Sequence, residues 1–97
     1  MGYLEIEQFS LAADVTQEAF SALDDEVQAW SYVHRAGLRR RTVAFGGDGA
    51  VAVVTLFGTP PPALGLDVPA TCEGALAAFA RAIEPGSYRR SVYEDRG

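Results

Sequence analysis

Several residue types are scarce or missing in this chain. It contains no lysine and no asparagine, and it has one cysteine and one histidine among 97 residues. A lone cysteine, Cys72, cannot form an intrachain disulfide, and one cysteine with one histidine cannot supply a structural zinc site. We therefore expect no bound metal and no disulfide within the chain.

Positive charge is also in short supply. The eight basic residues, all arginine, are outnumbered by 13 acidic residues, and the net charge is −5. Nucleic-acid binding requires a basic face, and anionic membranes attract basic segments as well. We therefore expect neither nucleic acid nor a membrane surface as a partner.

Long apolar runs and cofactor motifs are missing too. No run approaches the roughly 20 apolar residues that a membrane-spanning helix needs. The start "MGYLEIEQFS" lacks the basic and apolar regions of a signal peptide. The turn "GGDG" lacks the lysine followed by serine or threonine that completes a phosphate-binding loop, and no flavin or nicotinamide motif is visible. The expectation is a cytoplasmic protein without a cofactor.

The length indicates one small domain over residues 1–97. Hydrophobic residues make up 48% of the chain and charged residues 22%, which is an ordinary globular composition. A domain this short buries a smaller fraction of its surface than a large one does. Because a second copy could supply the missing burial, we expect a homodimer.

Apolar periodicity indicates four strands. Leu4 and Ile6 face one way on the first strand, while residues 3, 5, 7 and 9 face the other. A turn rich in glycine joins the next two strands as a hairpin. The third strand is apolar on both faces, which is typical of a strand that is covered on both sides. The expected strands are residues 3–11, 38–45, 50–58 and 88–94.

Two helices are expected between these strands. Asp14 or Thr16 offers an N-cap to the first, and Gly37 follows its end, as a terminating glycine does. Asp24 and its acidic neighbours lie largely off the apolar stripe, and Thr71 can cap the second helix. The first helix spans residues 15–35, with a stripe of Ala19, Phe20, Leu23, Val27, Trp30 and Val33. The second spans residues 72–84, with Leu76, Phe79, Ala80 and Ile83 on its inner face.

The order β-α-β-β-α-β is that of a ferredoxin-like α+β fold. Its four-stranded antiparallel sheet carries two helices on one face, with the last strand beside the first. The doubly apolar third strand indicates that the other face is covered as well. In a chain this small, the expected cover is the sheet of a second subunit, which completes a dimeric α/β barrel.

Segments along most of the chain resemble the dimeric α/β-barrel superfamily, especially its small bacterial members related to antibiotic-biosynthesis monooxygenases. The similar segments are "EQFSLA", "QAWSYVHRAG", "GLRRRT" and "PATCEGALAAFARAIEPGSYRRSVYE". Within them the most specific marks are Gly37, Arg41 with Thr42, Phe79 and Tyr93. One segment departs from the family pattern: the third strand ends in "LFGTPPPALG", with Phe57 where relatives often carry tryptophan.

The resemblance implies a cofactor-independent monooxygenase or isomerase that acts on an aromatic or polyketide-like small molecule. The substrate pocket would then be drawn from Trp30, Phe57, Phe79 and Tyr93. Structural alternatives exist for two of them, since Trp30 also fits the core and Tyr93 fits a dimer seam. The altered end of the third strand and the lack of a paired catalytic constellation favour the other hypothesis, a non-catalytic ligand-binding or structural dimer module.

Two residues are candidates for the chemistry. His34 would act as a general base near neutral pH, although a histidine in the last turn of a helix is also stabilised by the helix dipole. Arg41 matches a family position and would stabilise an enolate or phenolate. Because the side chains of a strand alternate, Arg40 faces away from Arg39 and Arg41. A structural ion pair is the alternative role for Arg41.

Opposite charges also face each other across the first and last strands. We expect Glu5 and Glu7 to lie near Arg89 or Arg90, where such a pair stabilises the sheet by roughly 0.2–1 kcal/mol. That structural role is a sufficient explanation for both glutamates.

Overall fold

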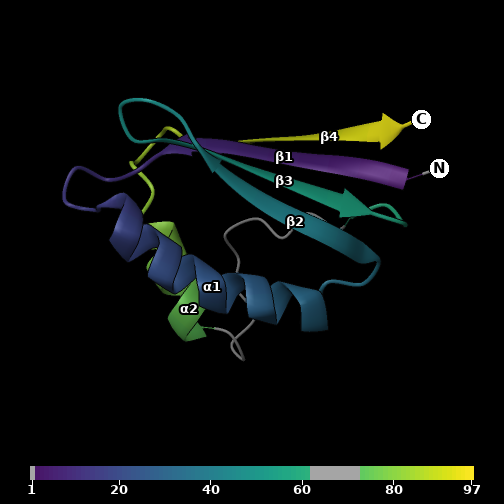
Figure 1. Ribbon diagram of the computed structural model, residues 1–97, viewed down its shortest axis with the longest axis horizontal. Helices are drawn as coiled ribbons and strands as arrows, with labels where there is room; N and C mark the ends of the chain where they lie inside the picture. The colour runs from purple at the N-terminus through teal and green to yellow at the C-terminus, as the bar shows by residue number, and fades with distance from the viewer. Residues whose placement is uncertain (1, 62–72) are drawn as a thin grey trace.

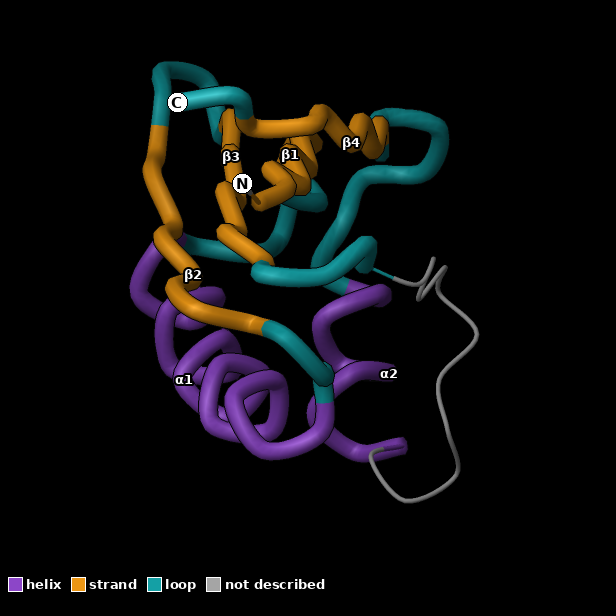
Figure 2. Tube along the Cα trace, turned by 90° about the vertical axis from the view of Figure 1, so that its right-hand side faces the viewer, coloured by secondary structure: helices purple, strands orange, loops and turns teal. Residues whose placement is uncertain are grey.

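The structure is a computed structural model that describes residues 2–61 and 73–97. The four strands form one antiparallel sheet in the order β2-β3-β1-β4. Both helices cover the same face of this sheet (Figure 1), which is also clear in the side view of Figure 2. The ferredoxin-like fold is thereby confirmed. Its elements are β1 Gly2–Ser10, α1 Gln17–His34, β2 Leu38–Phe45, β3 Ala50–Phe57, α2 Glu73–Arg81 and β4 Arg89–Asp95.

Strand β1 lies in the middle of the sheet, and its alternation decides which side chains face the helices. In the register with β3, Glu5 lies opposite Thr55 and Glu7 lies opposite Val53. Phe9 faces the same side and is buried in the core. The even-numbered residues of β1 face away from the helices, so the predicted alternation is confirmed. Two glutamates therefore point into the space between the sheet and the helices.

An aromatic cluster anchors both helices on the sheet near the end of β1. The ring centroids of Phe9 and Phe20 are 5.8 Å apart, and those of Phe9 and Phe79 are 5.6 Å apart, both edge-to-face. Such pairs contribute about 0.5–1.5 kcal/mol beyond the burial of their area. Val51 and Val53 of β3 complete this core.

Both ends of α1 have identifiable caps. The Thr16 hydroxyl oxygen accepts a hydrogen bond from the Ala19 N–H at 3.1 Å, so Thr16 is the N-cap of the two candidates. Arg35 is the C-cap, and its backbone N–H donates to the Ser31 carbonyl at 2.9 Å. Gly37 follows with φ +80°, a left-handed conformation that glycine adopts without strain. The chain can therefore turn directly from α1 into β2.

The inner face of α1 differs from the predicted apolar stripe. Its buried residues are Phe20, Asp24, Val27 and Ser31, whereas Val33 is 78% exposed. The expectation that Asp24 lies off the inner face is wrong, because this carboxylate is buried by an ion pair with β2. The three-and-four spacing of apolar residues was therefore sufficient to predict the helix, but it did not predict which row of residues faces the sheet.

Helix α2 ends at Arg81, earlier than predicted, because the next residues pair with the end of β1. Ile83 forms an isolated bridge with Leu11, and the Glu84 N–H donates to the Ser10 carbonyl at 2.8 Å. The expected cap Thr71 lies outside the described residues, as does Cys72. Neither helix, over the residues described, is long and apolar enough to cross a membrane.

The face of the sheet away from the helices is open in the single chain. Strand β3, which the sequence shows to be apolar on both faces, has buried residues on the helix side and partly exposed residues on this face. Tyr93 of β4 also lies on this face, opposite Leu4 in the sheet register, and it is 54% exposed. The apolar side chains of the open face are Leu4, Ile6, Ala52, Val54 and Leu56.

Candidate functional site

Glu5 is the centre of a buried cluster of charge between the sheet and α1. Arg35 donates to Glu5 Oε1 at 2.8 Å and to Oε2 at 3.0 Å, and Arg90 of β4 donates to Oε2 at 2.7 Å. Burial alone would raise the pKa of Glu5, but hydrogen bonds and positive charge from both arginines hold it below its ordinary value. Glu5 is therefore an ionised structural carboxylate, and its predicted contact with Arg90 is confirmed.

Arg41 is neutralised by a carboxylate of its own subunit. It donates through Nη1 to Asp24 Oδ2 at 2.9 Å and through Nη2 to Oδ1 at 2.7 Å, a bidentate geometry that is stronger than a single contact. Its backbone N–H donates to the Tyr32 hydroxyl oxygen at 3.0 Å. Both charged side chains are at least nine-tenths buried. Arg41 therefore forms a structural ion pair, which was the alternative role considered for it from the sequence.

Glu7 differs from the other two carboxylates of this interior. Its Oε2 accepts a hydrogen bond from the Tyr88 hydroxyl of β4, and none of the ion pairs found among the described residues includes it. Burial raises the pKa of Glu7 above its ordinary value. Burial and the neighbouring Glu7 raise the pKa of Tyr88 as well, so the phenol is neutral and donates its proton.

Sequence reasoning missed this role for Glu7, which it assigned to a cross-strand ion pair. Arg89 lies opposite Gln8 and faces away from the helices, whereas Arg90 lies opposite Glu7 in the sheet register. The predicted nearness of Glu7 to Arg90 is therefore confirmed, but the ion pair found for Arg90 is with Glu5. The alternation of β1 already indicated that Glu7 lies on the same side of the strand as Glu5 and Phe9. A glutamate between Glu5 and Phe9 on the inward side of a strand must give up part of its hydration, and such a carboxylate tends to have a functional or structural partner.

Three buried polar atoms have no hydrogen-bond partner among the described residues: Trp30 Nε1, Arg35 Nε and Thr55 Oγ1. Thr55 is fully buried and lies between Glu5 and Arg41 in the sheet register. Leaving a buried donor or acceptor unpaired costs about 1–3 kcal/mol. Such atoms are uncommon in folded proteins and call for an explanation, such as a bound polar molecule.

Metal binding has no support in this part of the molecule. Across residues 2–61 and 73–97, no group of three or more histidine, cysteine, aspartate or glutamate side chains is arranged to hold a metal ion.

His34 and Arg41, the two candidate catalytic residues, lie on different flanks of α1. His34 stacks on Trp30 with ring centroids 5.1 Å apart, and its Nδ1 lies 3.1 Å from the Trp30 carbonyl oxygen at an exposed position. Arg41 contacts the row of residues 24, 28 and 32. Two residues along a helix correspond to about 200° of rotation, so residues 30 and 34 point away from that row. The structure brings His34 to Trp30 but not to Arg41.

The remaining predicted pocket residues occupy three separate places. Phe57 is buried under the Arg35 guanidinium, with Cζ 4.7 Å from the ring centroid. Phe79 packs on Phe9, which pairs with Val51, six residues or about 20 Å along β3 from Phe57. Tyr93 lies on the open face of the sheet. Phe57 therefore lies beside the charged interior, whereas Phe79 and Tyr93 do not.

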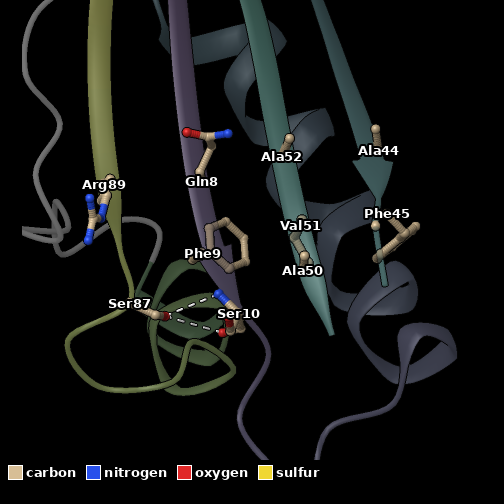
Figure 3. Close-up of a pocket in the computed structure, with 11 residues that line it drawn as sticks. Gln8, Phe9, Ser10, Ala44, Phe45, Ala50, Val51, Ala52, Ser87 and Arg89 are labelled. Atoms are coloured by element: carbon tan, nitrogen blue, oxygen red, sulfur yellow. Dashed lines mark hydrogen bonds between the residues drawn. The ribbon is translucent and has the colours of Figure 1, made fainter. Parts of the chain in front are cut away.

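A separate hollow of about 590 Å³ lies at the hairpin end of the sheet. Figure 3 shows its floor of Ala44 and Ala52, with Gln8 beside them and Arg89 at the margin on β4. The Ser87 hydroxyl oxygen accepts a hydrogen bond from the Ser10 N–H at 3.1 Å, which fastens the start of β4 to β1. This hollow is wide and opens on the same side as the open face.

Comparisons with known proteins support the fold. The sequence matches no protein-family model and no curated protein. SnoaB, a cofactor-independent oxygenase from Streptomyces nogalater, has a TM-score of 0.73 at 10% identity, covering 99% of this chain and 94% of that one. A protein from Caulobacter crescentus CB15, assigned as an antibiotic biosynthesis monooxygenase, has a TM-score of 0.69 at 12% identity, covering 99% and 92%. These proteins share the fold of this chain.

A third solved structure shares this fold and carries a ligand. It is the monooxygenase from the gene ActVA-Orf6 of Streptomyces coelicolor in complex with Nanaomycin D. Its TM-score is 0.64 at 16% identity, covering 99% of this chain and 88% of that one. The resemblance that the sequence suggested is therefore confirmed at the level of the fold.

Proposed function

We propose that this protein is a cofactor-independent, monooxygenase-like enzyme that binds an aromatic or polyketide-like small molecule between its sheet and α1. One observation carries the proposal: this interior contains buried polar atoms without partners and a carboxyl group, Glu7, outside every ion pair found in the described chain. Such groups suit a ligand that has both an apolar ring system and oxygen substituents. The oxygenases that share the fold are consistent with it.

Trp30 and Phe57 are the ligand-contacting aromatic residues in this proposal. The Thr55 hydroxyl and the Trp30 N–H would donate hydrogen bonds to ligand oxygens, because neither has a described partner. His34 stays a candidate base at the exposed end of α1. Arg41 stays a candidate for charge stabilisation, although Asp24 already neutralises its guanidinium.

The direct test is oxygen consumption without any added cofactor. The purified protein is incubated with a hydroxylated anthrone, and oxygen uptake is followed with an electrode while the quinone product is identified by mass. We expect uptake above the autoxidation measured with heat-denatured protein, and less uptake with Trp30→Ala or Thr55→Val. A rate equal to autoxidation would contradict the enzymatic proposal.

The alternative function is a non-catalytic ligand-binding or structural module. The arginines of this interior favour it, because each of the three already pairs with Glu5 or Asp24 and is therefore less available to stabilise a transition state. The same incubation separates the two functions. A module would bind the anthrone, seen as quenching of Trp30 fluorescence, without raising oxygen uptake above autoxidation.

We also propose that the protein acts as a homodimer through the open face of the sheet. Its apolar side chains, which include Ile6 and Val54, would pack on those of a second copy, as stacked sheets do at a spacing of about 10 Å. Light scattering after size exclusion should give twice the chain mass of 10.4 kDa. Val54→Arg should give a folded monomer, whereas Arg81→Gln on α2 should remain a dimer. A wild-type monomer at micromolar concentration would contradict this assembly.

A further inference from the structure

The hollow at the hairpin end of the sheet has a cationic lining, although the chain as a whole is acidic. Of the described residues that line it, Arg89 is the only charged one. Gln8 lies opposite Arg89 in the sheet register, and Figure 3 shows it between Arg89 and Ala52. Neither the Arg89 nor the Gln8 side chain has a hydrogen bond or ion pair with another described residue. The polar groups of this hollow are therefore available to a bound molecule.

The dimensions of the hollow follow from the sheet register. Ala44, Ala52, Gln8 and Arg89 form one row across β2, β3, β1 and β4, and the two alanines leave open space over their strands. Three strand spacings of about 4.8 Å separate the ends of this row, so it is about 14 Å long. The volume of about 590 Å³ falls within the range of about 300–1,000 Å³ that is usual for small-molecule sites.

Arg89 also lacks a counter-charge on its own face of the sheet. Among the strand residues of the open face, Asp95 is the only acidic one, placed there by its register with Gly2. It lies six residues from Arg89 along β4, or about 20 Å. If a second copy covers this face, as proposed above, Arg89 would be withdrawn from water. A guanidinium enclosed without a negative partner is costly, so the hollow favours an anionic occupant.

We propose that this hollow binds an aromatic carboxylate, with the carboxylate group on Arg89 and the flat ring system over Ala52 and Ala44. The fork of a guanidinium matches the two oxygens of a carboxylate, and the Gln8 amide can donate a further hydrogen bond. The alanine side chains end at Cβ, so a ring can lie flat across β3 and β2. The apolar part of the ligand then covers the floor, while its charge stays at the margin.

This site is separate from the one in the proposed function. The proposed enzyme holds its ligand between the sheet and α1, whereas the hollow opens on the other face of the sheet. No bond is made or broken at the hollow. The inference therefore does not depend on oxygenase activity.

The test is calorimetric titration with 2-naphthoate, an anion at neutral pH, and with 2-naphthamide, a neutral molecule of nearly the same shape. We expect the wild type to bind the naphthoate at least about tenfold more tightly, because hydrogen bonds between charged groups contribute more than those between neutral ones. The naphthoate affinity should fall as sodium chloride is added, since salt screens an exposed charge. The naphthamide affinity should change little.

Three variants assign the effect to this hollow. Arg89→Gln should reduce the preference for the naphthoate to less than about twofold, because the charged partner is gone. Ala52→Leu should weaken the binding of both ligands, because the larger side chain fills the floor. Arg81→Gln removes another exposed arginine, which lies on α2 and outside the lining, and it should behave as the wild type. The comparison of the two ligands on the wild type does not require that any variant folds.

The inference would be overturned by absence of naphthoate binding, by equal affinity for the two ligands, or by a preference that persists in Arg89→Gln. A fourth outcome would overturn it in favour of another occupant. If the wild type binds no naphthoate but Asp95→Asn does, Arg89 is paired with Asp95 of a second copy.

Oxygen uptake with the anthrone is measured separately, so this inference and the proposed function can fail independently. A protein that binds the naphthoate through Arg89 but consumes no oxygen has this site without the enzymatic activity. A protein that consumes oxygen but has no preference for the naphthoate has the activity without this site.

Discussion

Removing the negative charge of Asp24 should destabilise the fold strongly, because it leaves the Arg41 guanidinium buried without a counter-ion. The two side chains are 8% and 3% exposed, and their closest atoms are 2.7 Å apart. Breaking a buried pair by removing one partner costs about 3–5 kcal/mol, whereas an exposed pair contributes about 0–1 kcal/mol. We expect Asp24→Asn to cost about 3 kcal/mol, which is a large share of the about 5–15 kcal/mol stability of a typical domain.

The assay is urea unfolding followed by circular dichroism at one fixed protein concentration, since a dimer would unfold in a concentration-dependent way. Asp25→Asn is the matched control, because Asp25 is exposed on the same helix and should change stability by less than about 0.5 kcal/mol. The double variant with Asp24→Leu and Arg41→Met should recover most of the loss, because it removes both buried charges. If Asp24→Asn costs no more than Asp25→Asn, the pair behaves as a surface pair and the reasoning fails.

Three further predictions concern single positions. Thr55→Val should keep or raise the free energy of unfolding, measured in urea, because it removes an unpartnered buried hydroxyl of similar volume; a loss above about 2 kcal/mol would mean that the hydroxyl is bonded. The lowered pKa of Glu5 makes its contribution to stability full above its ordinary value of 4.5 and lost as pH falls below it. Glu7 opposes this loss through its raised pKa, so the acid-side fall in urea midpoint should be steeper in Glu7→Gln than in the wild type. Gly37→Ala should cost about 1–3 kcal/mol, because φ at this position is +80° and an added Cβ would collide with Thr59. Gly47→Ala, whose added Cβ would meet no atom within 4 Å, should cost less than about 1 kcal/mol in the same assay.

The fold could be predicted because its signals are local. The alternation around Leu4 and Ile6, the three-and-four spacing of α1 and the glycine after it each depend on a few neighbouring residues. Together they permit few arrangements, since the β-α-β-β-α-β order has one common sheet order. The ends of α2 were less predictable, because Ile83 leaves the helix to pair with Leu11.

The candidate site could be predicted only in part, because its contacts join residues far apart in sequence. Glu5 and Arg90 are adjacent across β1 and β4, so their contact followed from strand order. The contact between Arg41 and Asp24 did not follow from strand order, because the apolar periodicity of α1 places Asp24 on the solvent-facing side. Arg35 was not considered for a role, since the residue after a helix has no fixed direction until the strand register is known. The contact of Glu7 with Tyr88 could not be predicted without knowing that the neighbouring arginines pair with Glu5 and Asp24.

The two ends of the inner row of α1 place a limit on how this chain can evolve. Asp24 binds β2 and Arg35 binds β1, and they are eleven residues apart, which is close to three full helical turns. Insertion or deletion of one residue between them would rotate one partner by about 100° and shift it by about 1.5 Å. Length variation among descendants of this sequence should therefore be absent between these two positions and accumulate in the hairpin around Gly47, where added residues disturb neither pair.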